Sequence, residues 1–338
     1  MESDDDARCL IQPEAGQAEE LDHEAEAFEG SVFTLLMASV VQDLARLTIG
    51  TDSKFVRVAR LTISMTMVAA LMFLQAFLLI SVNKLLCESA VERIRELYSD
   101  YEVHMYHNHT VQIWTGFQRG IPGYFDATQF NQFGDDDRSL LCQIPLAHVK
   151  YISCILVVWT LTCFIELRLI MSQSMQVLVA TPTVDSMSQA LASTDTPHEV
   201  EVVGLTLPVK AVIGLFVLLP RCICAGVLTW LGCRWLIATP SLGDVLLNGL
   251  ALEFILMLKN LLFESFASKR SRLVVQRTRF QPVDKFETAT YYSFFGSFSW
   301  VLLAMTFVCA YVFYFQQVLP DFRWDVHQVC SSMVRRKK

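Results

Sequence analysis

Long uncharged stretches of apolar residues recur along the chain, and they determine its architecture. The first, residues 61–82, has no charged side chain over roughly 22 positions, the length of a helix that crosses the hydrocarbon core of a bilayer. Lipid offers the backbone no hydrogen bonds, so repeated stretches of this kind are typical of a helical bundle. The sequence therefore predicts an all-α polytopic transmembrane bundle, with spans at residues 61–83, 151–171, 211–236, 243–267 and 288–315.

The segment before the first span, residues 31–50, has a different pattern. Apolar residues such as Phe33, Leu36 and Val40 recur at helical spacing, and Asp43 lies off their face. The pattern predicts an amphipathic helix that lies on the inner membrane surface or packs under the bundle. Docking of a partner protein on this helix is the alternative.

Charge is scarce in this chain and unevenly distributed. The 338 residues are 53% hydrophobic and 18% charged. Most of the net charge of −7 comes from residues 1–30, which contain eleven acidic residues and a single Arg or Lys, Arg8. Such a segment buries too little apolar surface to fold, so we expect a disordered acidic cytoplasmic tail. Residues 172–208 contain no Lys or Arg and are expected to form a cytoplasmic linker.

The positions of Lys and Arg predict how the spans are oriented. Basic residues precede the first span, and others crowd residues 268–287, between the fourth and fifth spans. Both segments are therefore expected in the cytoplasm, which places residues 84–150 outside the cell or in the lumen of the secretory pathway. The protein itself is expected in a membrane of the secretory pathway or in the plasma membrane. The tail at residues 316–338 then lies outside, although its own basic end favours the opposite side. Contact with anionic lipid head groups is expected from three residues of the basic link: Lys269, Arg270 and Arg272.

The predicted external loop, residues 84–150, contains two sites for covalent modification. Asn108 begins the sequon Asn-His-Thr, an acceptor for N-linked glycosylation. Cys87 and Cys142 lie near the two membrane ends of the loop, and a disulfide between them closes it in an oxidising compartment; the alternative is that both are buried thiols. The histidines of the loop lack the number and spacing of ligands that a metal site needs.

Ionisable residues inside the spans are the main functional candidates, because charge is costly in lipid and faces the bundle interior. At 1.5 Å per residue, Arg221 rises from the inner end of the third span to near the midplane, and Glu253 descends the fourth span to a similar depth. These two are predicted to form a buried ion pair. Glu166 and Lys259 fall in the inner third and are predicted to form a second pair.

Other polar groups accompany these pairs. Asn260 shares the helix face of Glu253, and Asn248 lies in the outer half of the fourth span. Pro220, beside Arg221, is expected to interrupt its helix and free backbone groups at depth. Two interpretations follow: a polar path for an ion, proton or small anion, or a clamp of matched charges that only fixes helix packing.

The fourth span also carries a resemblance. The run Asn248-Gly-Leu-Ala-Leu-Glu-Phe-Ile-Leu, followed by Leu261-Leu-Phe-Glu-Ser-Phe-Ala and a basic stretch, resembles a segment of uncharacterised multi-pass membrane proteins of single-celled algae and related protists. Those proteins carry an acidic pair where this chain has Lys259 and Asn260. The resemblance implies a membrane protein and brings no particular activity with it.

Two functions fit these patterns. The first is a channel or transporter component for an ion or small solute, which with so few spans would form its pore as a homo-oligomer. The second is a non-transporting scaffold or receptor-like protein whose loop and tail bind partners. No catalytic motif is present, so neither enzymatic activity nor a cofactor is expected. Nucleic acid is not an expected partner, because the basic cluster lies beside the membrane.

Overall fold

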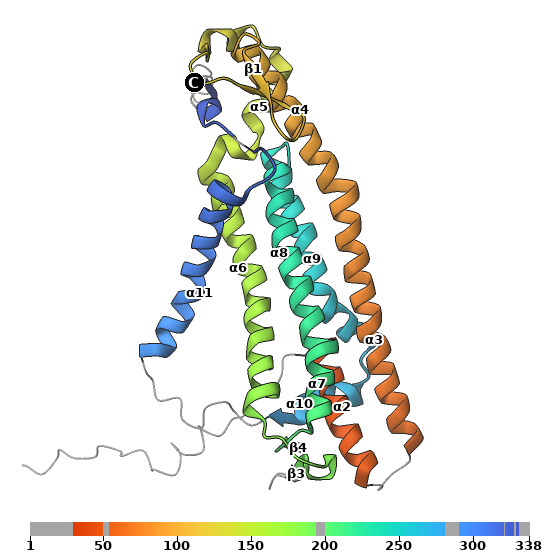
Figure 1. Cartoon of the computed structure of the whole chain (residues 1–338). Helices are drawn as coiled ribbons and strands as arrows, with labels where there is room; N and C mark the ends of the chain where they lie inside the picture. Colours follow the sequence, from red (N-terminus) through yellow and green to blue (C-terminus); the bar gives the residue numbers. More distant parts are fainter. Residues whose placement is uncertain are drawn as a thin grey trace, which may run out of the picture.

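The computed structural model describes residues 30–49, 54–193, 200–280, 291–320, 322–327 and 329–330. Within them the protein is an elongated bundle of long helices, with a small folded cap at one end and a short sheet at the other (Figure 1). Five helices are long and apolar enough to cross a membrane. The predicted all-α bundle is therefore confirmed. The predicted acidic tail, apart from Gly30, lies outside the described residues.

The first crossing helix is the longest. α3 (Lys54–Ser81) continues through a π-helical turn, η2 (Val82–Cys87), into α4 (Glu88–Met105) without a break. The whole rod has 52 residues and is about 78 Å long at 1.5 Å per residue. This length exceeds the roughly 30 Å of a bilayer core, so the upper part of the rod forms the spine of the cap.

The other crossing helices also extend beyond or overlap the predicted spans. They are α6 (Val149–Ser174), which ends in η5 (Met175–Ala180); the rod formed by α7 (Leu207–Ile213), η7 (Gly214–Leu218) and α8 (Leu219–Ala238); α9 (Leu242–Phe266); and α11 (Tyr291–Ala310) with η8 (Tyr311–Phe315). Residues 288–290 of the predicted fifth span lie outside the described residues. α11 packs on α6 and diverges from the other helices away from the cap (Figure 1).

The expected interruption at Pro220 takes a mild form. Proline has no backbone N–H, so the carbonyl one turn earlier loses its helical partner. The chain accommodates this loss with the π-helical turn η7 directly before α8, and the helix continues to Ala238. Further along the same rod, Gly232 lets α6 approach closely, because a Cβ there would lie 2.3 Å from Nε1 of Trp159.

The predicted amphipathic helix is α2 (Val32–Ile49), and it packs under and into the bundle. It folds back against α3 and also contacts α9 and α10 (Lys269–Arg277). Its polar side chains are bound inside: Ser39 pairs with Ser64 of α3 at 3.3 Å, and Asp43 forms an ion pair with Arg60. Because both its apolar and its polar faces are covered, α2 fills the end of the bundle opposite the cap, which we call the inner end.

A three-stranded sheet closes that inner end. β5 (Thr278–Phe280) follows α10 and pairs in parallel with β4 (Val200–Val202), which pairs antiparallel with β3 (Leu191–Ser193). Nε2 of Gln42 in α2 donates a hydrogen bond to Oγ1 of Thr278 at 2.8 Å. Residues 191–193 and 200–202 of the predicted linker thus form strands, and residues 194–199 and 281–290 lie outside the described residues.

The cap at the other end is built on α4. Its parts are the hairpin of β1 (Thr110–Gln112) and β2 (Gln118–Gly120), η3 (Ala127–Asn131), α5 (Asp135–Gln143) and η4 (Pro145–His148). The hairpin is bonded to α4 through Glu102, which accepts a 2.5 Å hydrogen bond from the backbone N–H of Gly120. C-terminal residues after η8 complete the cap core, since Val318, Leu319 and Val326 are 0% exposed.

The disulfide of the cap differs from the predicted one. Cys142 of α5 is bonded to Cys330 near the C-terminus, and Cys87 is a buried free thiol. The prediction of a Cys87–Cys142 bond was wrong, because it paired cysteines within the loop, whereas the C-terminal segment returns to pack on the cap. The disulfide therefore joins the segment after the last crossing helix to the cap.

Docking of this C-terminal segment is predicted to depend on pH through Asp325. Burial raises the pKa of its carboxyl above the ordinary value, against the lowering effect of a 3.0 Å hydrogen bond from the Tyr106 hydroxyl. A carboxyl whose pKa is higher in the folded than in the unfolded state adds to the free energy of unfolding at low pH. That addition is lost as pH rises from the unfolded-state pKa, about 4, through the raised pKa of the folded state.

The thermal unfolding midpoint of the wild type is therefore expected to fall as pH rises above about 4, and to fall less in Asp325→Asn. Differential scanning fluorimetry of both proteins across this range measures the difference. Equal pH profiles for the two proteins would exclude Asp325 as the titrating group.

Candidate functional site

Three charged side chains meet inside the bundle, each from a different crossing helix. Glu166 lies on α6, Arg221 on α8 and Lys259 on α9. Each is about 26 Å along its helix from the end nearest the cap, at 1.5 Å per residue. Their exposed fractions are only 7%, 4% and 7%. We call these three residues the charged cluster; it lies in the inner part of the bundle.

Glu166 is the centre of the charged cluster and uses both carboxylate oxygens. Nε of Arg221 donates a 2.6 Å hydrogen bond to Oε1, and Nζ of Lys259 forms an ion pair with Oε2. Nη1 of Arg221 also donates to Oε1 of Gln173 at 2.6 Å. Gln173 is two turns from Glu166 on the same face of α6. Charge-assisted bonds of this kind are the strong hydrogen bonds of protein interiors.

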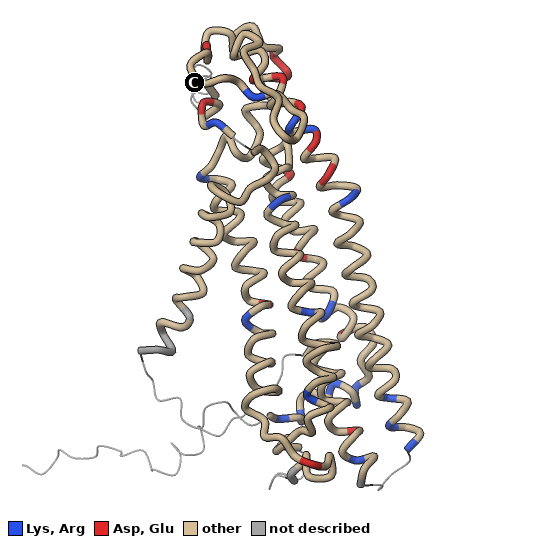
Figure 2. The backbone as a smooth tube through the Cα atoms, in the orientation of Figure 1, with Lys and Arg blue, Asp and Glu red and all other residues tan. Residues whose placement is uncertain are grey.

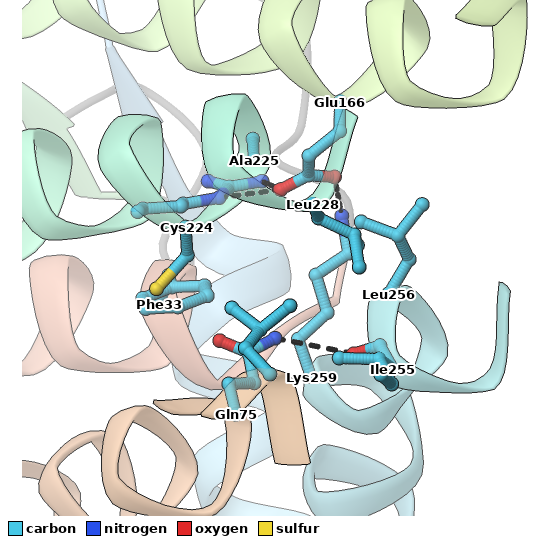
Figure 3. A pocket seen from close by; sticks show the side chains of 11 residues that line it. Phe33, Gln75, Glu166, Cys224, Ala225, Leu228, Ile255, Leu256 and Lys259 are labelled. Carbon is cyan, nitrogen blue, oxygen red and sulfur yellow. Dashed lines mark hydrogen bonds and ion pairs between the residues drawn. The ribbon is translucent and has the colours of Figure 1, made fainter. Parts of the chain in front are cut away.

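A small cavity adjoins the charged cluster (Figure 3). The ring of Phe33, at the start of α2, lies 4.8 Å from the Arg221 guanidinium carbon, in a cation–π contact. On another side, Nε2 of Gln75 donates a 3.2 Å hydrogen bond to the carbonyl of Ile255. The cavity has a volume of about 20 Å³, enough for one species of the size of water.

The charges around this cavity do not balance. Arg221 and Lys259 carry two positive charges, and Glu166 carries one negative charge. Among the described residues, no further acidic side chain forms an ion pair with either cation. A net charge in an apolar interior is costly. The cavity is therefore electrostatically suited to a small anion.

The predicted pair of Arg221 and Glu253 is wrong. Their depths were counted from opposite ends of two spans that are both longer than the bilayer core is thick. Counted from the shared end near the cap, Arg221 lies about 10 Å deeper than Glu253. Arg221 is therefore level with Glu166 and forms its ion pair there. The predicted pair of Glu166 and Lys259 is confirmed.

The other polar candidates of the fourth span lie apart from the charged cluster. Glu253 is half-buried and lines an apolar groove between α6 and α9, together with Val158 and Trp159. Nδ2 of Asn248 donates a 2.8 Å hydrogen bond to Oγ1 of Thr239, which ties α9 to the end of α8. Asn260 is half-buried, and its Oδ1 has no hydrogen-bond partner among the described residues.

The surface candidates are accessible. Asn108 is exposed in the turn after α4, with a φ of 62°, on the cap. Lys269 and Arg270 are exposed in the first turn of α10. Arg272 donates hydrogen bonds to the carbonyls of Glu264 and Ala267 at 2.5 and 3.3 Å. The last of these basic residues thus braces the turn between α9 and α10.

Three residues of the site were not predicted to lie there from the sequence: Phe33, Gln75 and Gln173. Gln173 carried a usable signal, because its spacing from Glu166 places both on one helix face. Phe33 and Gln75 carried none, since their roles depend on how α2 and α3 pack against other helices. Contacts of that kind are not encoded in local spacing.

The five apolar helices and the interior charged cluster define the class of the protein as a multi-pass integral membrane protein. Comparison of the chain with protein-family models, with curated proteins and with solved structures gives no match. The resemblance of the fourth span to algal and protist membrane proteins therefore stays a prediction.

Proposed function

We propose that the protein is a membrane transport component for a small monovalent inorganic anion. The observation that supports this proposal most strongly is the charged cluster beside the cavity, with two cations against the single carboxylate of Glu166. A bound halide would neutralise the excess positive charge of the charged cluster. The role of Lys259 is then to supply that charge, and Arg221 and Glu166 form a neutral pair that holds it in place.

The inner end of the bundle supports a gating role for α2. This helix occupies the space between the cluster and the inner end, and Phe33 lies against Arg221. Its seam with the bundle combines buried apolar side chains with the hydrogen bond of Ser39 to Ser64 and the ion pair of Asp43 with Arg60, so opening would have to break both kinds of contact. Withdrawal of α2 would open the cavity toward that end.

Flux of chloride and iodide into liposomes that contain the purified protein tests the proposal. Wild type is expected to carry halide, and Lys259→Met is expected to reduce flux by about tenfold or more, because the positive potential that concentrates the anion is lost. Lys259→Met should fold, since Arg221 and Glu166 still pair. Glu253→Gln is the matched control and should keep wild-type flux. Absence of halide flux with the folded wild type, or equal flux in wild type and Lys259→Met, would refute the proposal.

A scaffold or receptor-like function is the second candidate, and the cap favours it. The hairpin presents Val111 and Trp114 to solvent, with exposed fractions of 57% and 77%. The disulfide between Cys142 and Cys330 holds the surrounding cap together. The flux measurement separates the two functions: a folded protein that carries no ion directs the search to binding partners of this hairpin.

The same proposal includes an orientation. The basic residues at the start of α3 and on α10 lie at one end of the bundle, and the disulfide-bonded cap lies at the other (Figure 2). Positive charge favours the cytoplasmic side, and a disulfide favours an oxidising compartment. We therefore assign the cap, and with it the C-terminal segment, to the lumen or exterior of the secretory route.

Glycosylation of Asn108 is the prediction that checks this orientation. In a eukaryotic expression host the wild type is expected to show a glycosidase-sensitive shift on a gel, because exposed sequons are modified only in the lumen. Asn108→Gln should remove the shift, and its melting temperature should be unchanged. A chain whose mobility never responds to glycosidase would argue against a lumenal cap.

A further inference from the structure

An apolar groove lies on the lipid-facing side of the bundle, and a pair of basic residues follows one of its lining residues along the chain. The groove lies between α3 and the inner end of α9, has a volume of about 330 Å³, and is lined by Ile63, Met67, Ala70 and Phe266 among others. The hydroxyl of Thr66, also in the groove, donates to a carbonyl of its own helix. The surface that the groove presents is therefore almost entirely hydrocarbon.

The groove has the dimensions of a single acyl chain. It follows α3 from Thr62 to Ala70, which is about 12 Å at 1.5 Å per residue. One leaflet of a bilayer core is roughly 15 Å deep. A chain lying in the groove would thus remain within one leaflet, the one at the end of the bundle opposite the cap.

Two basic residues follow the groove closely along the chain. Phe266, which lines the groove, is the last residue of α9, and Lys269 and Arg270 open α10 three and four residues after it. Both are exposed, and neither forms an ion pair or side-chain hydrogen bond with another described residue. Cations in the first turn of a helix are locally unfavourable. Nothing within the described chain offsets that cost, which an external anion would remove.

We propose that this groove and the pair Lys269 and Arg270 form a binding site for one anionic glycerophospholipid. Its acyl chain lies between α3 and α9, and its phosphate and acidic head group face the two cations. The site is separate from the charged cluster and does not depend on the transport proposal. Each basic residue is expected to contribute about fivefold to the preference for anionic over zwitterionic lipid.

Native mass spectrometry of the delipidated full-length protein tests the site. The protein is given equal amounts of phosphatidylserine and phosphatidylcholine, and the first bound lipid is identified. Wild type is expected to prefer phosphatidylserine by about 25-fold, and Lys269→Gln with Arg270→Gln should reduce that ratio to near one. The control, Lys54→Gln with Arg277→Gln, removes two exposed charges that lie eight and eleven residues along the chain from the nearest groove residue, and it should leave the ratio unchanged.

A second pair of variants tests the groove itself. Ala70→Phe fills it and is expected to lose the retained lipid, whereas Ala69→Phe, also exposed on α3 but outside the groove, should keep it. Both changes lie on the lipid-facing surface, so folding is preserved. Equal retention of the two lipids by wild type, equal effects of the two charge pairs, or full retention in Ala70→Phe would each overturn the proposal.

Discussion

Replacing Glu166 with Ala is expected to eliminate most of the folded protein, whereas Lys259→Met is expected to leave it folded. The asymmetry arises because Glu166 is the common partner of Arg221 and Lys259. Its removal leaves two buried cations without a counter-charge, and breaking a buried ion pair in this way costs about 3–5 kcal/mol. Total stability is only about 5–15 kcal/mol in typical proteins. Removal of Lys259 instead leaves a neutral pair.

Fluorescence-detected size-exclusion chromatography and thermal melting in detergent measure this effect. Glu253→Ala is the matched control, because Glu253 is a carboxylate on a crossing helix outside the charged cluster. It should keep a monodisperse peak. The triple variant Glu166→Leu, Arg221→Met, Lys259→Leu should recover folding, since apolar side chains of similar size replace buried ion networks at little cost. A Glu166→Ala protein as stable as wild type would show that the cations find other partners.

The spans could be predicted from the sequence because each one is a local property of the chain. A run such as residues 61–82 must be helical and apolar whatever it packs against. The pairing of charges could not be predicted in the same way. It depends on the relative depth of different helices. Depths counted from opposite ends of the third and fourth spans put Arg221 level with Glu253, whereas in the structure Arg221 is level with Glu166.

The cap illustrates the same limit over a longer distance. The loop sequence predicts a disulfide from Cys87 and Cys142, but the bond forms between Cys142 and Cys330, with a sequence separation of 188 residues. The deciding contacts come from C-terminal backbone: Arg95 donates to the carbonyl of Val318 at 2.8 Å, and Arg119 donates to that of Pro320 at 3.1 Å. Hydropathy and cysteine spacing do not predict contacts between segments so far apart in the sequence.

Loss of the disulfide is expected to destabilise the cap strongly. A disulfide that closes a loop of this length lowers the conformational entropy of the unfolded chain, which adds about 5 kcal/mol to the free energy of unfolding in the chain-entropy description. Cys330→Ser and Cys142→Ser should therefore lower the melting temperature equally, and the reductant that opens the bond in wild type should have the same effect. Cys87→Ser should have little effect on the reductant response, because Cys87 is a free thiol.

Electrophoresis without reductant identifies the bonded cysteines independently of stability. The cross-linked unfolded chain is more compact, so wild type and Cys87→Ser should run faster than their reduced forms, while Cys142→Ser and Cys330→Ser should show no such difference. If Cys87→Ser abolished the mobility difference, the bond would instead join Cys87 to another cysteine of the loop, and the C-terminal segment would not be linked to the cap. Since Val318, Leu319 and Val326 are fully buried there, the bond acts on a segment that is already docked by apolar packing, and it adds a covalent link to that docking.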